Sequence, residues 1–111
     1  MKLIVAGGRD YVLGDDDFDK LSSIDGITEL VSGGARGVDQ YAETWATSKN
    51  IPIKQFKPDW KSYGRAAGPV RNREMAKYAD AVMLFPGGKG TASMLEIAVK
   101  ENLTIFDYRL A

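Results

Sequence analysis

Residues 3–9 read Leu-Ile-Val-Ala-Gly-Gly-Arg, so that four apolar residues run directly into two glycines and an arginine. A nearly continuous apolar run of this length is typical of a central strand covered on both faces. The same arrangement returns twice, because the apolar runs 27–31 and 81–85 are each followed closely by a glycine-rich segment. These stretches predict buried strands that end in glycine-containing loops.

Two further apolar runs complete a set of five predicted strands. Residues 51–56 alternate and contain Pro52, which suits an edge strand, and residues 104–106 form the last run. Apolar spacings of three and four residues, together with helix-start signals, predict four helices, over residues 16–23, 38–46, 69–78 and 91–99. Strict alternation of strand and helix predicts an α/β fold with a five-stranded, mainly parallel sheet and helices on both faces.

The length and the composition narrow the chemistry. A chain of 111 residues fits one domain, which we expect to span residues 1–111. It contains no His and no Cys, which excludes disulfides, Cys/His zinc sites and His-based catalytic triads. No apolar run approaches the roughly 20 residues that span a bilayer, and the first residues do not resemble a signal peptide. We therefore expect a cytoplasmic protein with no membrane partner, no metal and no cofactor.

The placement of glycine and arginine favours an anionic ligand. Glycines follow the predicted strands at Gly7, Gly8, Gly33, Gly34, Gly37, Gly87, Gly88 and Gly90. The carboxyl ends of parallel strands border the usual ligand crevice, and glycine there lets backbone N–H groups approach a phosphate closely. The arginines gather in the same regions, at Arg9, Arg36, Arg65, Arg71 and Arg73. Three such loops favour a phosphate-bearing ligand over tight turns alone.

Residues 57–68 are predicted to be one long irregular connection, and Pro69 is well placed to open the helix after it. Trp60 and Tyr63 in this connection either anchor it by packing or offer a ring on which a nucleobase stacks. Asp39 either caps a helix or holds a ribose hydroxyl, and the structural role is favoured. Asp59 is a candidate either for turn formation or for a ligand contact.

Five motifs in order resemble the SLOG superfamily, the Rossmann-like group that contains the Smf/DprA and Lonely-guy (LOG) proteins. They are Gly7-Gly8-Arg9-Asp10, Ser-Gly-Gly-Ala-Arg-Gly-Val-Asp at 32–39, residues 58–69, Arg-Asn-Arg-Glu-Met at 71–75 and Pro-Gly-Gly-Lys-Gly-Thr at 86–91. The chain is most similar to the small YspA-like branch. The resemblance covers nearly the whole chain and implies a single SLOG-type nucleotide-binding domain with a Rossmann-like three-layer sandwich.

What the resemblance implies is a nucleotide-derived ligand held by its phosphates, in a sensor or a sequestering module. The expected phosphate- and ligand-binding residues are Gly7, Gly8, Arg9, Gly33, Gly34, Arg36, Asp39, Arg71, Asn72, Pro86, Gly87, Gly88, Gly90 and Thr91. The expected base or loop contacts are Asp59, Trp60, Tyr63 and Arg65. LOG-type relatives form dimers, so a homodimer or higher homo-oligomer is expected, with Tyr41, Trp45 or Tyr78 buried against a second subunit.

The same resemblance bears on catalysis. LOG enzymes cleave the N-glycosidic bond of nucleoside monophosphates with an Arg and a Glu, and Arg71 matches the Arg. Met94 occupies the Glu position, and Glu96 lies about 200° further around the helix. This departure favours binding over catalysis. The alternative is a LOG-like nucleoside 5'-monophosphate N-glycosidase in which Arg71 works with Asp10, Asp39 or Glu96. A DprA-like single-strand DNA binder, and a nucleic-acid partner in general, are disfavoured by the net charge of zero.

Overall fold

Strands and helices alternate along the chain, as the apolar runs predict. The structure, a computed structural model, describes residues 1–110. Its elements in order are β1 (Lys2–Ala6), α1 (Asp15–Ser22), β2 (Glu29–Ser32), α2 (Val38–Ser48), β3 (Ile53–Gln55), α3 (Trp60–Tyr63), a 3-10 turn (Gly64–Ala66), α4 (Ala67–Tyr78), β4 (Ala81–Leu84), α5 (Lys89–Lys100) and β5 (Thr104–Asp107). None of the helices in this described part of the chain is long and apolar enough to cross a membrane.

The five strands form one sheet in the order β3-β2-β1-β4-β5, and every pairing in it is parallel. The sheet is thus wholly rather than mainly parallel, and β3 lies at an edge, as Pro52 indicates. The chain moves outward from β1 to β3 and then returns to the other side of β1 to form β4. Ligands bind at such a reversal in open α/β sheets. The loops that follow β1 and β4 therefore border the predicted site.

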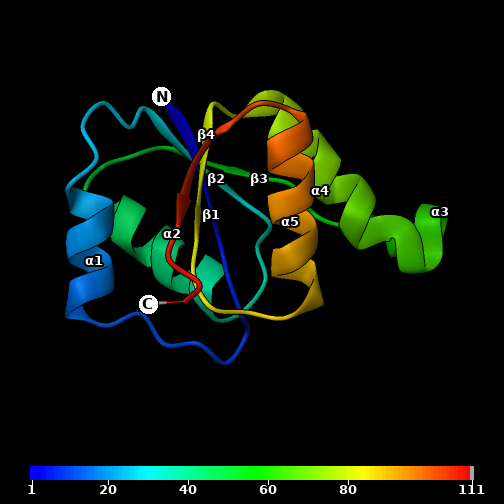
Figure 1. The fold of residues 1–111 in the computed structure, drawn as a ribbon, viewed down its shortest axis with the longest axis horizontal. Helices are drawn as coiled ribbons and strands as arrows, with labels where there is room; N and C mark the ends of the chain where they lie inside the picture. The colour runs from blue at the N-terminus through cyan, green and yellow to red at the C-terminus, as the bar shows by residue number, and fades with distance from the viewer. Residues whose placement is uncertain (111) are drawn as a thin grey trace.

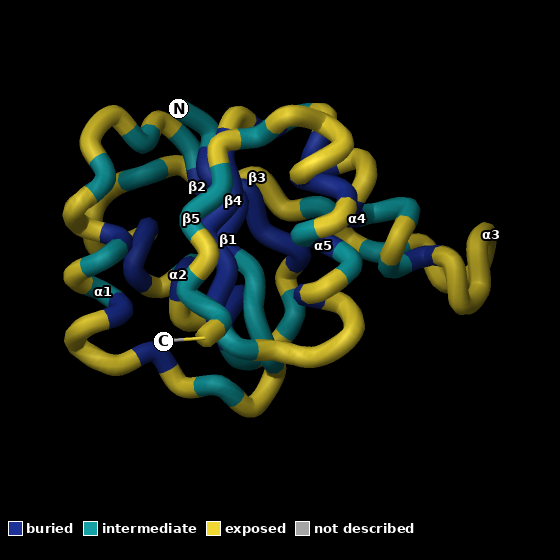
Figure 2. The backbone as a smooth tube through the Cα atoms, in the orientation of Figure 1, coloured by how far each residue is buried: buried dark blue, intermediate teal, exposed yellow. Residues whose placement is uncertain are grey.

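Alternate strand residues supply two separate cores, which gives the three-layer sandwich. In β1, Leu3 and Val5 pack on the side of α1 and α2, whereas Ile4 packs on the side of α4 and α5. Figure 1 shows the two helix pairs on opposite faces of the sheet. The middle strands are almost entirely buried, while α3 projects from one end of the molecule and is exposed (Figure 2). The Rossmann-like α/β fold expected from the sequence is confirmed.

The connection 57–68 differs from the prediction, because it is largely helical. The Asp59 carboxylate accepts the Ser62 N–H at 3.1 Å, and this N-terminal cap starts α3. Helix α4 then begins at Ala67, two residues before the predicted opening at Pro69. The hydrogen bond between Asp59 and Ser62 accounts for α3, and apolar periodicity in the sequence does not reveal such a bond.

The three aromatic residues expected at a dimer interface differ from one another in how far they are buried within this chain. Trp45 is 8% exposed and packs within this chain, so it is not available to a second subunit. The Tyr78 hydroxyl donates to Glu29 and its ring contacts Phe56, whereas Tyr41 is exposed. The homodimer stays a prediction.

The close fit of loop and helix at Gly7 generates a test of the fold. A Cβ at Gly7 would lie 2.6 Å from Val38 Cγ2 and 3.2 Å from Phe85 Cβ, so Gly7→Ala overpacks the core. We expect a loss of about 1–3 kcal/mol in the free energy of unfolding, measured by urea denaturation. Gly90→Ala is the control, because a Cβ there meets no atom within 4 Å. An equal loss in both variants would contradict the packing argument.

Candidate functional site

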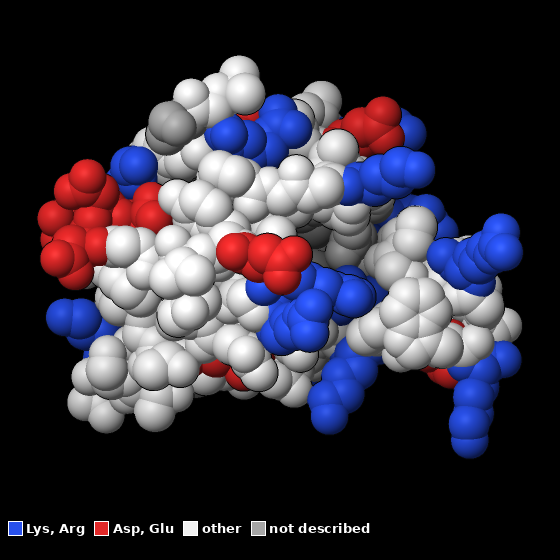
Figure 3. Space-filling model, turned by 90° about the horizontal axis from the view of Figure 1, so that it is seen from below, with Lys and Arg blue, Asp and Glu red and all other residues white. Residues whose placement is uncertain are grey.

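The loops after β1, β2 and β4 enclose a cavity of about 370 Å³ at the carboxyl edge of the sheet. It collects most of the predicted ligand-binding residues, namely Gly7, Gly8, Arg9, Gly33, Asp39, Arg71, Asn72, Gly88, Gly90 and Thr91. Met94, which stands at the LOG glutamate position, also lines it and is 1% exposed. Figure 3 looks onto this edge and shows Lys and Arg side chains around its middle, next to a smaller acidic group, and a larger group of acidic side chains over α1.

Backbone hydrogen bonds fix the loop after β1 between its neighbours. The Gly8 N–H donates to the Pro86 carbonyl at 2.9 Å, and the Gly8 carbonyl accepts the Val38 N–H at 3.2 Å. Gly37 has φ +84°, and a Cβ there would lie 2.6 Å from the Arg9 carbonyl carbon. A Cβ at Gly87 would lie 2.8 Å from the Gly8 nitrogen. These glycines thus have packing reasons of their own, independent of any ligand.

Gly88 and Gly90 are different, because no protein atom lies within 4 Å of a Cβ built at either position. Both line the cavity, at the start of α5. Gly88 is the N-cap residue of α5 and makes no side-chain cap. The first N–H groups of a helix have no partner within the helix and carry its positive dipole end. The cavity is therefore bordered by a helix N-terminus without a side-chain cap, beside which Gly88 and Gly90 leave open space.

Arg71 supplies a guanidinium from α4. Its Nη1 donates to the carbonyl oxygens of Gly33 at 3.0 Å and Phe56 at 3.4 Å, and its Nε donates to Asn72 Oδ1 at 3.0 Å. Asn72 is buried, and its Nδ2 donates to the Gly90 carbonyl at 3.5 Å. The space for the guanidinium exists because Gly33 has no side chain: a Cβ there would lie 2.9 Å from Arg71 Cζ. Arg71 is thus held at the cavity by three strand-end and helix contacts.

Asp39 is the carboxylate that lines the cavity. Its Oδ2 accepts the Ala35 N–H at 3.1 Å, so Asp39 supports the loop before α2 rather than capping the helix as expected, and the residue is 8% exposed. Burial raises the pKa of Asp39 to about 6, although the Ala35 hydrogen bond and the Arg71 charge oppose the rise. Burial lowers the pKa of Arg71, an effect that the charge of Asp39 opposes and that of Arg9 increases.

A second pocket of about 500 Å³ adjoins the cavity. Five residues line both: Arg9, Gly33, Ala35, Arg71 and Gly90. The pocket adds Gly34 and Trp60 from the predicted set, and Lys57, Pro58 and Gly68 from the connection 57–68. Cavity and pocket therefore adjoin at Arg71, and the two together are called the depression below.

Several predicted contacts lie outside this depression. Asp59 is exposed and caps α3, and its acceptance of hydrogen bonds from Ser62 lowers its pKa. Tyr63 and Arg65 are exposed on α3 and the following turn without lining the cavity or the pocket. Pro86 and Gly87 shape the loop after β4 through their backbone.

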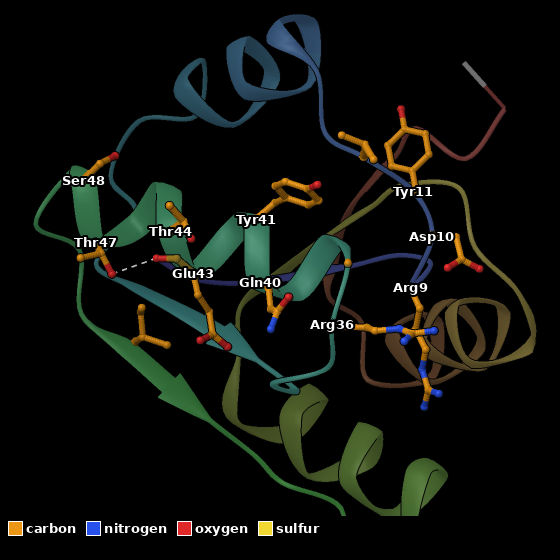
Figure 4. Close-up of a pocket in the computed structure, with 13 residues that line it drawn as sticks. Arg9, Asp10, Tyr11, Arg36, Gln40, Tyr41, Glu43, Thr44, Thr47 and Ser48 are labelled. Carbon is orange, nitrogen blue, oxygen red and sulfur yellow. Dashed lines mark hydrogen bonds between the residues drawn. The ribbon is translucent and has the colours of Figure 1, made fainter.

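Arg36 instead lines a larger groove, of about 1030 Å³, over the outer surface of α2. In Figure 4 its side chain lies beside that of Arg9, which borders groove and cavity alike. Asp10 lines this groove as well, and Glu96 is exposed on α5, so neither lies in the cavity. Among residues 1–110 no three Asp or Glu side chains are grouped to hold a metal ion.

Sequence reasoning missed some residues that line the depression. Met75 lies one helical turn after Arg71, so the helical period already places it on the same face. Lys57 lies just after β3, at the carboxyl edge of the sheet, so its place after a predicted strand could have identified it as a candidate. Ala35 acts through its backbone N–H, for which no side-chain signal exists.

The raised pKa of Asp39 makes the stability of the protein depend on pH. In the folded state the carboxyl has a pKa of about 6, against 3.8 for an ordinary aspartate, so the folded state binds more protons between these values. The Asp39 contribution to stability is present below about pH 4 and is lost as the pH rises through 6, by about 3 kcal/mol. Asp39→Asn keeps an acceptor for Ala35 and removes the titration. The difference in unfolding free energy between wild type and variant, measured from pH 4 to 8, should show this fall; a flat difference would contradict it.

Comparisons with known proteins place the chain in a family. A family model described as "YspA, cpYpsA-related SLOG family" (YAcAr) matches residues 1–63. This match contains the loops after β1 and β2 and Trp60, and it ends before Arg71 and the loop after β4. The "Gene 61 protein" of Mycobacterium phage D29 is 33% identical over 87 residues, which is 71% of this chain and 70% of that protein.

Two solved structures share the fold. DNA processing protein A (DprA) from Streptococcus pneumoniae superposes with a TM-score of 0.73 and 18% identity, over 96% of this chain and 49% of DprA. The chain thus spans about half of DprA. The protein TM1055 superposes with a TM-score of 0.67 and 18% identity, over 94% of this chain and 71% of TM1055. From its motifs, its fold and the family match, the chain belongs to the YspA-related SLOG family.

Proposed function

We propose that the chain binds a nucleotide-derived small molecule by its phosphate in the cavity beside α5, as a sensor or sequestering module. The observation that carries this proposal is the uncapped start of α5, where Gly88 and Gly90 leave open space in front of the helix. A phosphate there would accept hydrogen bonds from the free first-turn N–H groups and meet the positive end of the helix dipole.

Charges around the cavity support the same ligand. Arg71 is anchored through Nη1 and Nε, and Arg9 borders the cavity from the loop after β1. The two like charges lie close enough for Arg9 to lower the pKa of Arg71. A bound phosphate would offset this repulsion, because a guanidinium pairs well with phosphate oxygens. Membership of the SLOG family supports a nucleotide-related module of Rossmann-like fold.

The binding proposal predicts thermal stabilisation. AMP or ADP-ribose at about a hundred times its dissociation constant should raise the melting temperature by roughly 10 °C. Arg71→Ala should abolish the shift, measured by differential scanning fluorimetry against each variant's own ligand-free baseline. Arg73→Ala is the matched control, because Arg73 is exposed on the same helix outside the cavity and should keep the full shift. The absence of a shift across a broad nucleotide panel in wild type would refute the proposal.

A second variant separates binding from folding. Gly88→Asp introduces an N-cap carboxylate into open space, so it should leave the unfolding free energy equal or a few tenths of a kcal/mol higher. The same carboxylate occupies the first-turn N–H groups and repels a phosphate, so nucleotide binding by calorimetry should be lost. Gly14→Asp is the control, since Gly14 is the N-cap of α1, is equally open and lies outside the cavity. Unchanged binding in Gly88→Asp would place the phosphate elsewhere.

One observation favours a second function, hydrolysis of an N-glycosidic bond. Of the three acids considered as partners for Arg71, Asp39 alone lines the cavity, and burial raises its pKa to about 6. A carboxyl that titrates near neutral pH can transfer a proton or stabilise positive charge on a sugar ring. Of the three acids, Asp39 is thus the one that we propose as the partner of Arg71 in such a reaction.

The hydrolase hypothesis has a direct test. Incubation with the four nucleoside 5'-monophosphates and chromatography would detect released free base. If the activity exists, Asp39→Asn should reduce the rate at least 100-fold, and the wild-type rate should change with an apparent pKa near 6. Glu96→Gln, on the exposed face of α5, is the control and should keep the rate. No free base from wild-type protein would contradict the hydrolase hypothesis and leave the binding proposal untouched.

A further inference from the structure

Trp60 lies at the border of the depression and is unusually exposed for so large an apolar side chain. It is 57% exposed, whereas Trp45, the only other tryptophan in the chain, is 8% exposed. Trp60 lines the pocket that adjoins the cavity. The sequence left open whether this ring anchors the connection by packing or stacks on a base. A ring that anchored the connection would be buried, as Trp45 is, so its exposure argues against the packing role.

The chain nevertheless holds Trp60 in a defined position. It is the first residue of α3, directly after the Asp59 cap, and the Tyr63 N–H donates to the Asp59 carbonyl at 3.0 Å. The segment packs on the turn after it and on the start of α4, the helix that carries Arg71. Figures 1 and 2 show α3 as an exposed arm at the end of the molecule. The backbone at Trp60 is therefore joined to Arg71 by a short, continuous helical path.

The pocket beside Trp60 has the chemistry of a base site. Trp60 and Pro58 supply apolar surface, and Lys57 and Arg71 supply positive charge. Arg71, Gly33 and Gly90 line both the pocket and the cavity, so the two lie side by side. A ligand with its phosphate at α5 would reach the pocket by passing Arg71. Every nucleobase has a π-face that stacks on an indole ring, whatever its hydrogen-bonding edge.

We propose that this pocket is a base subsite, in which the base of a phosphate-bound nucleotide stacks on Trp60. The inference rests on the proposed function and narrows its ligand to a nucleotide with an intact aromatic base, rather than a sugar phosphate or an inorganic anion. Stacking gives affinity with little discrimination among bases, so purine and pyrimidine nucleotides bind and the larger purine rings bind more tightly.

The test compares AMP with ribose 5-phosphate, which has the phosphate and the sugar but no base. Calorimetric titration of the full chain should give AMP an affinity roughly 5- to 150-fold higher than that of ribose 5-phosphate. Trp60→Ala should bring AMP down to the affinity of ribose 5-phosphate and leave the latter unchanged. Trp60→Phe should restore most of the difference. AMP should also quench the fluorescence of exposed Trp60 in wild type, and the Trp60→Phe variant should lose this quenching.

Tyr63→Ala is the matched control. Tyr63 lies on the same four-residue helix and is 49% exposed, yet it does not line the pocket, so its removal should leave both affinities unchanged. Because Trp60 and Tyr63 are both exposed, neither variant should alter the melting temperature of the ligand-free protein.

The outcomes separate this inference from the proposed function. Equal affinities for AMP and ribose 5-phosphate, with no effect of Trp60→Ala, would overturn the base subsite while the phosphate cavity stands. The base subsite is overturned in the same way if Tyr63→Ala, and not Trp60→Ala, weakens AMP binding. Failure of both AMP and ribose 5-phosphate to bind at millimolar concentration would overturn the phosphate cavity and the base subsite together.

Discussion

The site depends on the hydrogen bonds that Arg71 donates from α4 to the carbonyl oxygens of Gly33 and Phe56. These residues directly follow β2 and β3, so one guanidinium joins the helix to two strand ends. The bonds form only because Gly33 has no side chain where Arg71 enters. Asn72 extends the contact to the loop that starts α5. A single half-buried cation thus sets the width of the depression between α2, α4 and α5.

Apolar patterning predicted the sheet well, for physical reasons that are clear in the structure. Residues 3–6 and 81–85 are apolar at successive positions because both faces of β1 and β4 are covered by helices. The carboxyl ends of parallel strands lie at one edge of the sheet, so the glycine-containing loops that follow them lie together there. Most of the predicted ligand-binding residues line the cavity at this edge. The fold, and the edge of the sheet at which the candidate site lies, could therefore be derived from short-range sequence patterns.

The connection 57–68 could not be derived in the same way. Its helix has four residues and rests on one capped N–H, which leaves no apolar period to detect. Trp60 and Tyr63 look equivalent in sequence, but only Trp60 lines the pocket, because the position of α3 relative to α4 decides which ring does so. The roles of individual glycines were equally hidden: Gly87 and Gly88 are neighbours, yet only the former is required by packing.

The acidic residues of α1 and the basic residues of the site lie apart, which a net charge of zero conceals (Figure 3). For the phosphate-bearing ligand that we propose, such separation would favour approach from the basic side. The arm from Lys57 to Ala66 has consequences of another kind. It contributes no buried residue to either core, so its length and sequence can change at little cost in folding free energy. Evolution, or an engineer, can therefore exchange this arm for another while the scaffold beneath it stays the same. In the base subsite that we propose, such an exchange would change the surface on which a base stacks.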